Sequence, residues 1–461
     1  MFQLDFDNPI SIHFIGIGGI SMSGLAEVVL DRGFTVSGSD RQESEFTRRL
    51  ASRGATVFYG QRPENIPEKC DVVVYTAAIH ADNPEFAEAQ RRGIPMLTRA
   101  EMLGQLMKNY STAIAVSGTH GKTTTTSMVS HILMSAGCDP TISVGGVLPA
   151  IGGNIKVGSS GTFVAEACEY TDSFLSLYPT LGMILTVDAD HLDYFKTLEN
   201  IRRSFKKFTA LLPESGTLII NSAIDDYEYF TTDLKCPFIT YSIDHPADVT
   251  AEDIEYDQLA NGSFTCLYKG RKFGSFRLNV PGRHNVDNAL AAIAADIALD
   301  IPYEDINRGL LEFHGTDRRF QIIGKKDGVT IIDDYAHHPT EIRACLTTAQ
   351  NYPHKKLWCV FQPHTYTRTA SFLDDFASAL SLADEVILSD IYAARENNTV
   401  GVTSSDIVNR ISEMGTKASY IPDFPSIAEY LRPRLAEGDL LMTMGAGFAY
   451  KVGEILLEEN E

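Results

Sequence analysis

Short apolar runs alternate with helical segments along the whole chain. In the first unit the apolar runs are ISIHFIGIGG, GFTVSGSD, DVVVYTAAI and IPMLT. Helices are expected from about Ser21 and over RAEMLGQLMKN. Because strands that alternate with helices form parallel sheets covered by helices, the pattern predicts an α/β fold.

The same alternation continues through two further units. The second has the strands TAIAVSG, TFVAEA, LGMILTVD and GTLIIN and the helices TTTTSMVSHILMSAG and VDNALAAIAADIAL. Residues 246–276 are expected to form short antiparallel strands that extend this sheet, with turns at Asn261-Gly262 and Lys269-Gly270. The third unit has the strands GVTIIDD, KLWCVFQ, EVILSD and DLLMTMG. We therefore predict three α/β domains, at residues 1–108, 109–319 and 320–461.

Length, charge and cysteine content limit the kinds of protein that this chain could be. A chain of 461 residues is too long for one ordinary core. A formal net charge of -21 argues against nonspecific binding to nucleic acid or to an anionic membrane. The N-terminus lacks the features of a signal peptide, and no stretch approaches the roughly 20 apolar residues of a membrane helix. Since the seven cysteines are scattered, as in a reducing compartment, we expect a cytoplasmic protein without membrane insertion or a nucleic-acid partner.

The most specific motif is a glycine loop between the strand TAIAVS and the helix TTTTSMVSHILM. It reads Gly118-Thr119-His120-Gly121-Lys122-Thr123 and is followed by Thr124. A strand–loop–helix turn aims free backbone N–H groups at an anion, at the positive end of the helix dipole. Lys122 adds a positive charge for the β- and γ-phosphates, and the Thr123 hydroxyl can bind Mg²⁺. The alternative is a glycine turn with a surface lysine, which the flanking strand and helix disfavour.

Two candidate metal ligands follow successive strands. Glu166 ends TFVAEA, and His191 stands in the segment DADHL after LGMILTV. Ligands gather at the carboxyl ends of strands in open parallel sheets, so Glu166 can hold the Mg²⁺ shared with Thr123. His191 could serve a second Mg²⁺, although imidazole is an unusual ligand for a hard cation. The alternatives are an N-cap or loop acid for Glu166 and a hydrogen-bonded loop histidine for His191.

The segment PGRHNVDN leads into an alanine-rich helix. It places Asn285 and Asn288 three residues apart, on one face of the first turn. An amide offers both a donor and an acceptor, as the edge of adenine requires. Because asparagine at a helix start is more commonly a cap, the segment indicates adenine binding only together with the phosphate loop.

A second glycine-rich segment lies near the N-terminus. It reads Gly16-Ile17-Gly18-Gly19-Ile20-Ser21, and Asp40 ends the next strand, where a ribose-binding acid would stand. Ser21 takes the place of the third glycine of a dinucleotide fingerprint. The segment could therefore hold the diphosphate of NAD or that of another nucleotide at a helix N-terminus.

The GTHGKT loop resembles that of the Mur ligase and folylpolyglutamate synthetase superfamily. The segments GIGGISMSGLA, GRHNVDN, DDYAHHPTE and FQPHTYTRT resemble Mur ligase motifs in the expected order, and the first and the last two are similar to the alanine-adding branch. The resemblance spans essentially the whole chain. It implies a Rossmann-like UDP-binding domain, a central P-loop ATPase-like α/β domain and a C-terminal Rossmann-like α/β domain.

The resemblance also implies residue roles. ATP would be bound by Gly118, Thr119, His120, Gly121, Lys122, Thr123, Thr124, Asn285, Asn288, Arg319 or its neighbour Arg318, and Asp334. The UDP-sugar would be bound by Gly16, Gly18, Gly19, Ser21, Met22, Ser23 and Asp40. The amino acid would be bound by Tyr335, His337, His364 and Arg368, and Mg²⁺ by Thr123, Glu166 and His191. The catalytic residues would be Lys122, Glu166, His191, His337 and Arg368.

The implied reaction joins L-alanine to the lactyl carboxylate of UDP-N-acetylmuramate, at the expense of ATP and with Mg²⁺. That carboxylate attacks the γ-phosphate, an acyl phosphate forms, and the amine then displaces phosphate. Negative charge concentrates at each step, so Lys122 and the metal ligands Thr123 and Glu166 are the expected stabilisers.

Several departures and alternatives remain open. Thr365 stands where well-known members have arginine, Cys168 stands where the commoner form has an acid, and Arg395 stands where glycine is usual. The choice among L-alanine, glycine and L-serine is therefore undecided. The alternatives are a ligase that adds a preformed tripeptide to the same sugar nucleotide, a polyglutamate-type ligase, a nicotinamide dehydrogenase and a nucleotide-dependent regulator.

Overall fold

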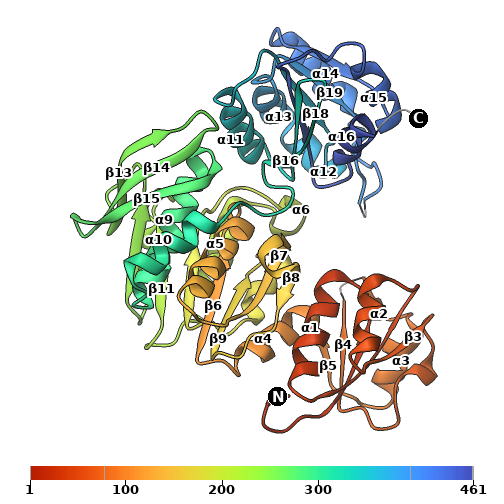
Figure 1. Cartoon of the computed structure of the whole chain (residues 1–461). Helices are drawn as coiled ribbons and strands as arrows, with labels where there is room; N and C mark the ends of the chain where they lie inside the picture. The colour runs from red at the N-terminus through yellow and green to blue at the C-terminus, as the bar shows by residue number, and fades with distance from the viewer. Residues whose placement is uncertain (1, 77, 395, 459–461) are drawn as a thin grey trace.

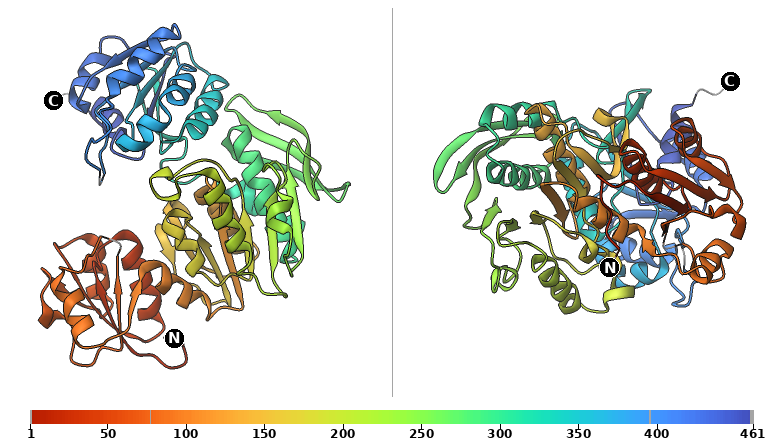
Figure 2. Two further views of the ribbon diagram at one scale, coloured as in Figure 1. Left: turned by 180° about the vertical axis from the view of Figure 1, so that it is seen from behind. Right: turned by 90° about the horizontal axis from the view of Figure 1, so that it is seen from below.

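A computed structural model describes residues 2–76, 78–394 and 396–458, so Arg395 lies outside the described residues. Three α/β domains follow one another along the chain, and the N-terminal and C-terminal ones lie at different ends of the central one (Figure 1). Figure 2 shows from behind that the two chain termini belong to these two outer domains. Within the described ranges, none of the helices combines the length and the apolar character needed to cross a membrane.

The N-terminal domain is built on a parallel sheet in the order β3-β2-β1-β4-β5. Its strands are β1 (Ser11–Ile15), β2 (Thr35–Asp40), β3 (Thr56–Tyr59), β4 (Val72–Tyr75) and β5 (Met96–Thr98). Its helices are α1 (Ile20–Asp31), α2 (Glu45–Ser52), α3 (Pro84–Arg91) and α4 (Arg99–Met107). The predicted Rossmann-like arrangement is confirmed, and β3 is a strand that the sequence analysis missed.

The described part of the central domain forms a ten-stranded sheet in the order β15-β14-β13-β12-β11-β10-β6-β9-β7-β8. Its strands are β6 (Thr112–Ser117), β7 (Thr141–Leu148), β8 (Gly153–Lys156), β9 (Thr162–Glu166), β10 (Leu181–Ile184), β11 (Thr217–Asn221), β12 (Phe238–Ser242), β13 (Val249–Tyr256), β14 (Asn261–Tyr268) and β15 (Arg271–Pro281). The main helices are α5 (Lys122–Ser135), α7 (Leu198–Thr209), α9 (Arg283–Ala298) and α10 (Tyr303–Glu312), with short helices α6 (Leu192–Phe195) and α8 (Glu228–Thr231).

The predicted antiparallel extension of the central sheet is confirmed, since β13, β14 and β15 pair antiparallel at its edge. The Lys269-Gly270 turn is also found, with φ of 51° and 72°. The predicted turn at Asn261-Gly262 is wrong, because Asn261 begins β14 and residues 257–260 make the connection. The hairpin of β7 and β8 and the strand β12 were not predicted.

The C-terminal domain has six described strands in the order β16-β17-β21-β18-β19-β20. The four predicted ones are β17 (Val329–Asp334), β18 (Leu357–Phe361), β19 (Glu385–Leu388) and β21 (Leu440–Met444). The edge strands β16 (Gln321–Lys326) and β20 (Lys417–Tyr420) were missed, since both are partly exposed and lack a continuous apolar run. The helices are α11 (Pro339–Gln350), α12 (Tyr366–Ser371), α13 (Leu373–Leu380), α14 (Ser404–Glu413), α15 (Phe424–Leu431) and α16 (Tyr450–Leu457).

The N-terminal and central domains share one apolar core. Met102 and Leu106 of α4 belong to the same buried cluster as Phe163 of β9 and Phe174. Gly104 allows this close approach, because a Cβ there would lie 1.9 Å from the Ser176 carbonyl oxygen. The proposed boundaries after residues 108 and 319 fall between α4 and β6 and between α10 and β16, and they stay proposals.

Helix α9 carries a buried acid in the middle of the central core. Asp296 is fully buried, and neither of its carboxylate oxygens has a hydrogen-bond partner among the described residues. Burial raises the pKa of Asp296 well above its usual value, so folding favours the protonated carboxyl. An unpaired buried polar group of this kind costs about 1–3 kcal/mol.

Changing Asp296 to asparagine should remove a pH-dependent loss of stability. A carboxyl whose pKa is raised by folding favours the folded state below its unfolded pKa of about 4, and this contribution is lost as the pH rises through the folded pKa. The free energy of unfolding of the wild type should therefore fall relative to that of Asp296→Asn as the pH rises from about 4 toward the folded pKa of Asp296. Urea denaturation across this range measures the difference. Asp300→Asn, at an exposed residue just beyond α9, is the control, and parallel curves for Asp296→Asn and the wild type would contradict the prediction.

Candidate active site

Most of the residues predicted to bind ATP line one cavity of about 370 Å³ between the central and C-terminal domains. These lining residues are Thr119, His120, Gly121, Lys122, Thr123, Thr124, Asn285, Asn288, Arg319 and Asp334. The cavity is also lined by Glu166, His191, Tyr335 and His337. Its lining does not include Gly118, Arg318, His364 and Arg368.

The phosphate loop adopts the backbone that its glycines permit. Gly118 and Gly121 have φ of 143° and 85°, in the region that favours glycine. At Gly121 a Cβ would also lie 2.6 Å from Asn288 Oδ1. Because Gly121 caps α5 without a side chain, the first backbone N–H groups of this helix remain available to an anion.

Lys122 is held across the loop by an acid to which the sequence analysis gave no role. Its Nζ donates to the carbonyls of Gly118 at 2.6 Å and Thr119 at 3.1 Å, and to the buried Glu169 carboxylate at 2.9 Å. Burial opposes the charged form, but Glu169 raises the pKa of Lys122 above its usual value. Lys122 therefore keeps its charge beside the phosphate site. The only sequence signal for Glu169 was its place three residues after Glu166.

The two predicted oxygen ligands for Mg²⁺ meet at the ends of adjacent strands. Thr123 Oγ1 donates to Glu166 Oε2 at 2.9 Å, and the Gly145 N–H donates to the same oxygen at 2.8 Å. Glu166 ends β9, and Thr123 lies in the first turn of α5, which follows β6; the strands β6 and β9 pair in parallel. Neighbouring oxygens around octahedral Mg²⁺ lie about 2.9 Å apart when each is 2.0–2.1 Å from the ion. The spacing of this pair therefore suits a magnesium ion.

His191 lies beside the carboxylates of Glu169 and Asp190. It adopts φ of 50°, and its Nε2 lies 4.0 Å from Glu169 Oε1 and 3.8 Å from Asp190 Oδ2. The ring of Tyr170 lies over the imidazole, with 4.4 Å between the ring centres. Burial lowers the pKa of His191, which favours the neutral form with a free lone pair. The role of His191 as a metal ligand stays a prediction.

The two predicted adenine residues are linked to each other on α9. Asn288 Nδ2 donates to Asn285 Oδ1 at 3.2 Å, and Asn285 Nδ2 donates to the Pro281 carbonyl at 2.7 Å. The residue that caps α9 is Gly282, so the capping alternative for the asparagines is wrong. His284 also lines the cavity, and burial together with Arg319 lowers its pKa to about 4. A neutral imidazole can contribute to binding the adenine base. The sequence analysis assigned no role to His284.

The structure separates the two candidate arginines. Arg318 turns into the C-terminal domain, where it donates to Asp333 at 2.8 Å and to the carbonyls of Gly445 and Gly447. Arg319 lines the cavity, 5.1 Å from the centre of the Tyr335 ring. Arg319 is therefore the better placed for a phosphate, as the sequence match favoured. Asp334, beside it, accepts from the backbone N–H groups of residues 320 and 336.

Arg368 is engaged with a central-domain acid that was not predicted. Its Nε and Nη2 donate to Asp190 Oδ1 at 3.1 and 2.7 Å, and its Nη1 lies 3.0 Å from His364 Nδ1. Both members of the ion pair are only 8% exposed. Burial raises the pKa of Asp190, but Arg368 and the neighbouring histidines together lower that pKa below its usual range. The pair therefore connects the predicted amino-acid site to the ATP cavity.

The other predicted amino-acid residues lie close to this pair. The His337 Nδ1 is 3.1 Å from the Tyr335 carbonyl oxygen and 3.2 Å from Glu341 Oε2. The ring centres of His337 and His364 are 5.7 Å apart. The structure thus brings Tyr335, His337, His364 and Arg368 together, as the motifs predicted, and what they bind stays a prediction.

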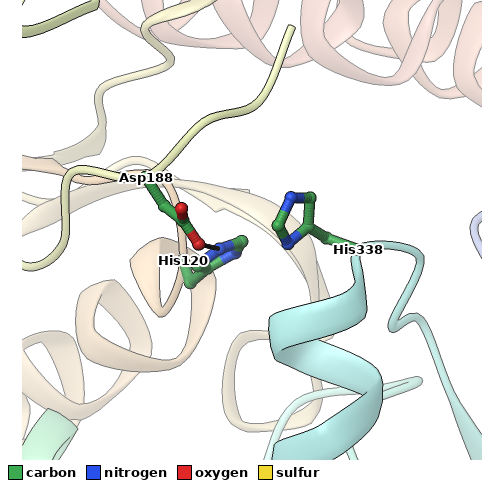
Figure 3. A group of neighbouring side chains, drawn as sticks. All are labelled: His120, Asp188 and His338. Carbon is green, nitrogen blue, oxygen red and sulfur yellow. Dashed lines mark hydrogen bonds and ion pairs between the residues drawn. The ribbon is translucent and has the colours of Figure 1, made fainter. Parts of the chain in front are cut away.

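His120 of the phosphate loop reaches the C-terminal domain. Its Nδ1 lies 3.1 Å from Glu341 Oε1, and its Nε2 lies 3.3 Å from Asp188 Oδ2. Figure 3 shows the contact between His120 and Asp188, with His338 of the C-terminal domain facing them. Burial disfavours the charged imidazole, but the two carboxylates raise the pKa of His120 to about 9. The contact between His120 and Glu341 joins the phosphate loop to α11.

The N-terminal glycine segment, predicted to bind the UDP-sugar, lies on the first domain. Gly16 has φ of 85°, and the Gly18 N–H donates to Asp40 Oδ2 at 2.8 Å. Gly19 caps α1 without a side chain, which leaves backbone N–H groups of the first turn available. Of the remaining predicted residues, Ser21 is partly buried, whereas Met22 and Ser23 are buried. None of these residues lines the ATP cavity. Because Asp40 already binds the loop, it is less suited to the ribose of a nicotinamide cofactor.

Comparison with known proteins agrees with this architecture. Three family models match in order: "Mur ligase family, catalytic domain" at residues 11–111, "Mur ligase middle domain" at 116–295 and "Mur ligase, glutamate ligase domain" at 318–447. A UDP-N-acetylmuramate–L-alanine ligase of Agathobacter rectalis is 56% identical over 100% of both chains. The crystal structure of the UDP-N-acetylmuramate–alanine ligase of Thermotoga maritima aligns with a TM-score of 0.80 at 30% identity, over 97% of this chain and 98% of that one. A murein peptide ligase of Psychrobacter arcticus aligns with a TM-score of 0.70 at 26% identity, over 97% and 98%. The chain belongs to the Mur ligase family.

Proposed function

We propose that this protein joins L-alanine to the lactyl carboxylate of UDP-N-acetylmuramate, with hydrolysis of ATP to ADP and phosphate. The observation that carries the proposal is the cavity in which the open N-terminus of α5, Lys122 and the Thr123–Glu166 pair face a group of C-terminal residues. A phosphate site and a second-substrate site on opposite walls of one cleft suit a reaction that activates a carboxylate and then transfers it. The full-length relatives with this activity in their names support the same substrates.

The residues of the cavity divide the chemistry between them. ATP would lie with its phosphates on the Gly118–Thr124 loop and its base beside Asn285 and Asn288. Mg²⁺ would be held by Thr123 and Glu166, with His191 nearby, and would withdraw charge from the transferred phosphoryl group. Lys122, fixed by Glu169, would stabilise the charge that builds up as the substrate carboxylate attacks. A location in the cytoplasm stays a prediction.

The second half-reaction, in which the amine displaces phosphate, would use residues of the C-terminal domain. The UDP-sugar would be anchored by its diphosphate at Gly16–Ser23, so that its lactyl arm extends toward the cavity. Tyr335, His337 and His364 would surround the amine substrate. Arg368 is bound to Asp190 and His364 in this arrangement, so it must exchange one of these contacts to bind the amino-acid carboxylate.

Product mass tests the proposal directly. The protein is mixed with ATP, Mg²⁺ and UDP-N-acetylmuramate, and separately with L-alanine, glycine, L-serine or the murein tripeptide. The expected result is an L-alanine adduct formed in step with phosphate release, with the other amino acids ranked below it. An adduct with the tripeptide alone would assign the protein to the peptide-adding ligases. No adduct with any amine would overturn the proposed sugar substrate.

A further inference from the structure

Three metal-ligating side chains meet where the central and C-terminal domains touch. They are His120 of the phosphate loop, Asp188 after β10 and His338 just before α11 (Figure 3). One ligand atom from each lies within 4.8 Å of the other two. We infer that His120, Asp188 and His338 form a site for a divalent transition metal of the zinc class. This site is distinct from the Mg²⁺ ligands proposed above.

The spacing of the first two ligands already suits such an ion. His120 Nε2 and Asp188 Oδ2 are 3.3 Å apart. Ligand atoms at 2.0–2.1 Å around a tetrahedral zinc ion lie about 3.3–3.4 Å from one another. The His338 nitrogen must approach by at most about 1.5 Å to complete three positions. Since His338 belongs to the other domain, a small adjustment of the domain contact supplies this movement.

Neighbouring groups orient all three ligands, as they do in established metal sites. His120 directs its other nitrogen to Glu341 Oε1 at 3.1 Å, which leaves Nε2 toward Asp188. His338 Nε2 donates to the Ala189 carbonyl at 3.1 Å, and Nδ1 accepts from the Thr340 backbone N–H at 3.3 Å, so a bound ion would have to replace one of these two hydrogen bonds. Asp188 Oδ2 accepts from Thr340 Oγ1 at 2.9 Å. The donors of this outer shell come from both domains, so a bound ion would be clamped between them.

The chemistry of the donors selects the class of metal. Two imidazoles and one carboxylate suit zinc and its neighbours, whereas Mg²⁺ prefers oxygen ligands alone. The carboxylates of Asp188 and Glu341 already face the protonated His120, so a divalent cation would displace a proton from this imidazole and take its place beside Asp188. Bound metal would tie the phosphate loop to α11, and it should therefore stabilise the two-domain contact and slow the release of substrates.

Cobalt absorption tests the site without any dependence on activity. Co²⁺ is added to the metal-free full-length protein, and visible ligand-field bands of a tetrahedral complex are expected without a sulfur charge-transfer band. His338→Asn removes the imidazole and keeps a residue that caps helices well. Asp188→Asn removes the charged carboxylate ligand that the central domain supplies. His191→Asn is the matched control, since asparagine tolerates the positive φ at this position.

The outcomes distinguish this site from the proposed Mg²⁺ site. The inference is supported if the bands persist in His191→Asn and if the affinity for Co²⁺ falls at least about ten-fold in His338→Asn or Asp188→Asn. Zn²⁺ should also raise the unfolding temperature of the wild type and not that of His338→Asn. Absence of bands in the wild type, bands unchanged in both ligand variants, or bands lost in His191→Asn would overturn the inference. If His338→Asn is misfolded by circular dichroism, Asp188→Asn alone decides.

Discussion

Replacing Lys122 with alanine should lower the ligation rate by about 10²–10³-fold or more. The Lys122 ammonium group lies at the open N-terminus of α5, and Glu169 and two loop carbonyls hold it there. A preorganised charge aimed at a transferring phosphoryl group acts mainly in the transition state. The loss should therefore fall on kcat more than on the KM for ATP. Phosphate release under saturating substrates measures it.

Two further variants sharpen this prediction. Glu169→Gln keeps the shape of the contact and removes its charge, so it should slow turnover less than Lys122→Ala does. Lys272→Ala, at an exposed lysine of β15, is the control and should leave turnover unchanged. Turnover near the wild-type value in Lys122→Ala would show that the phosphate loop has been assigned wrongly.

Asp190→Asn should weaken the attachment of the C-terminal domain. The substitution leaves the guanidinium of Arg368 without its charged partner in an environment where only 8% of the side chain is exposed. Breaking a buried pair by removing one partner costs about 3–5 kcal/mol. Because the pair bridges two domains, part of this cost should be relieved by domain opening. X-ray scattering should then report a larger radius of gyration, and ligation should slow.

A double-mutant cycle isolates the pair itself. Asp190→Asn, Arg368→Gln and the double variant are compared by urea denaturation, and a coupling of at least about 1 kcal/mol is expected. The control is Arg410→Gln, which removes an exposed contact with Glu413 whose loss should cost about 0–1 kcal/mol. Independent effects of the two substitutions, with no change in scattering, would refute the predicted domain connection.

The sequence by itself determined the features that depend on local order. The glycine positions, Lys122 and Thr123 fix a strand–loop–helix turn, because φ preferences and helix ends act over a few residues. Continuous apolar runs identified most buried strands, such as β17 and β21, for the same local reason. The family motifs then placed the three domains in order.

Only the tertiary structure decided which side chains meet across the cleft. Glu169 and Asp190 were ordinary loop acids in the sequence, and burial against Lys122 and Arg368 gave them partners. Arg318 and Arg319 are adjacent in the sequence, yet the first turns into the C-terminal domain and the second faces the cavity. Edge strands such as β16 escaped notice because their stability comes from pairing with a neighbour and not from their own apolar pattern. Contacts of this kind depend on how distant segments pack, and local preferences carry no information about that packing.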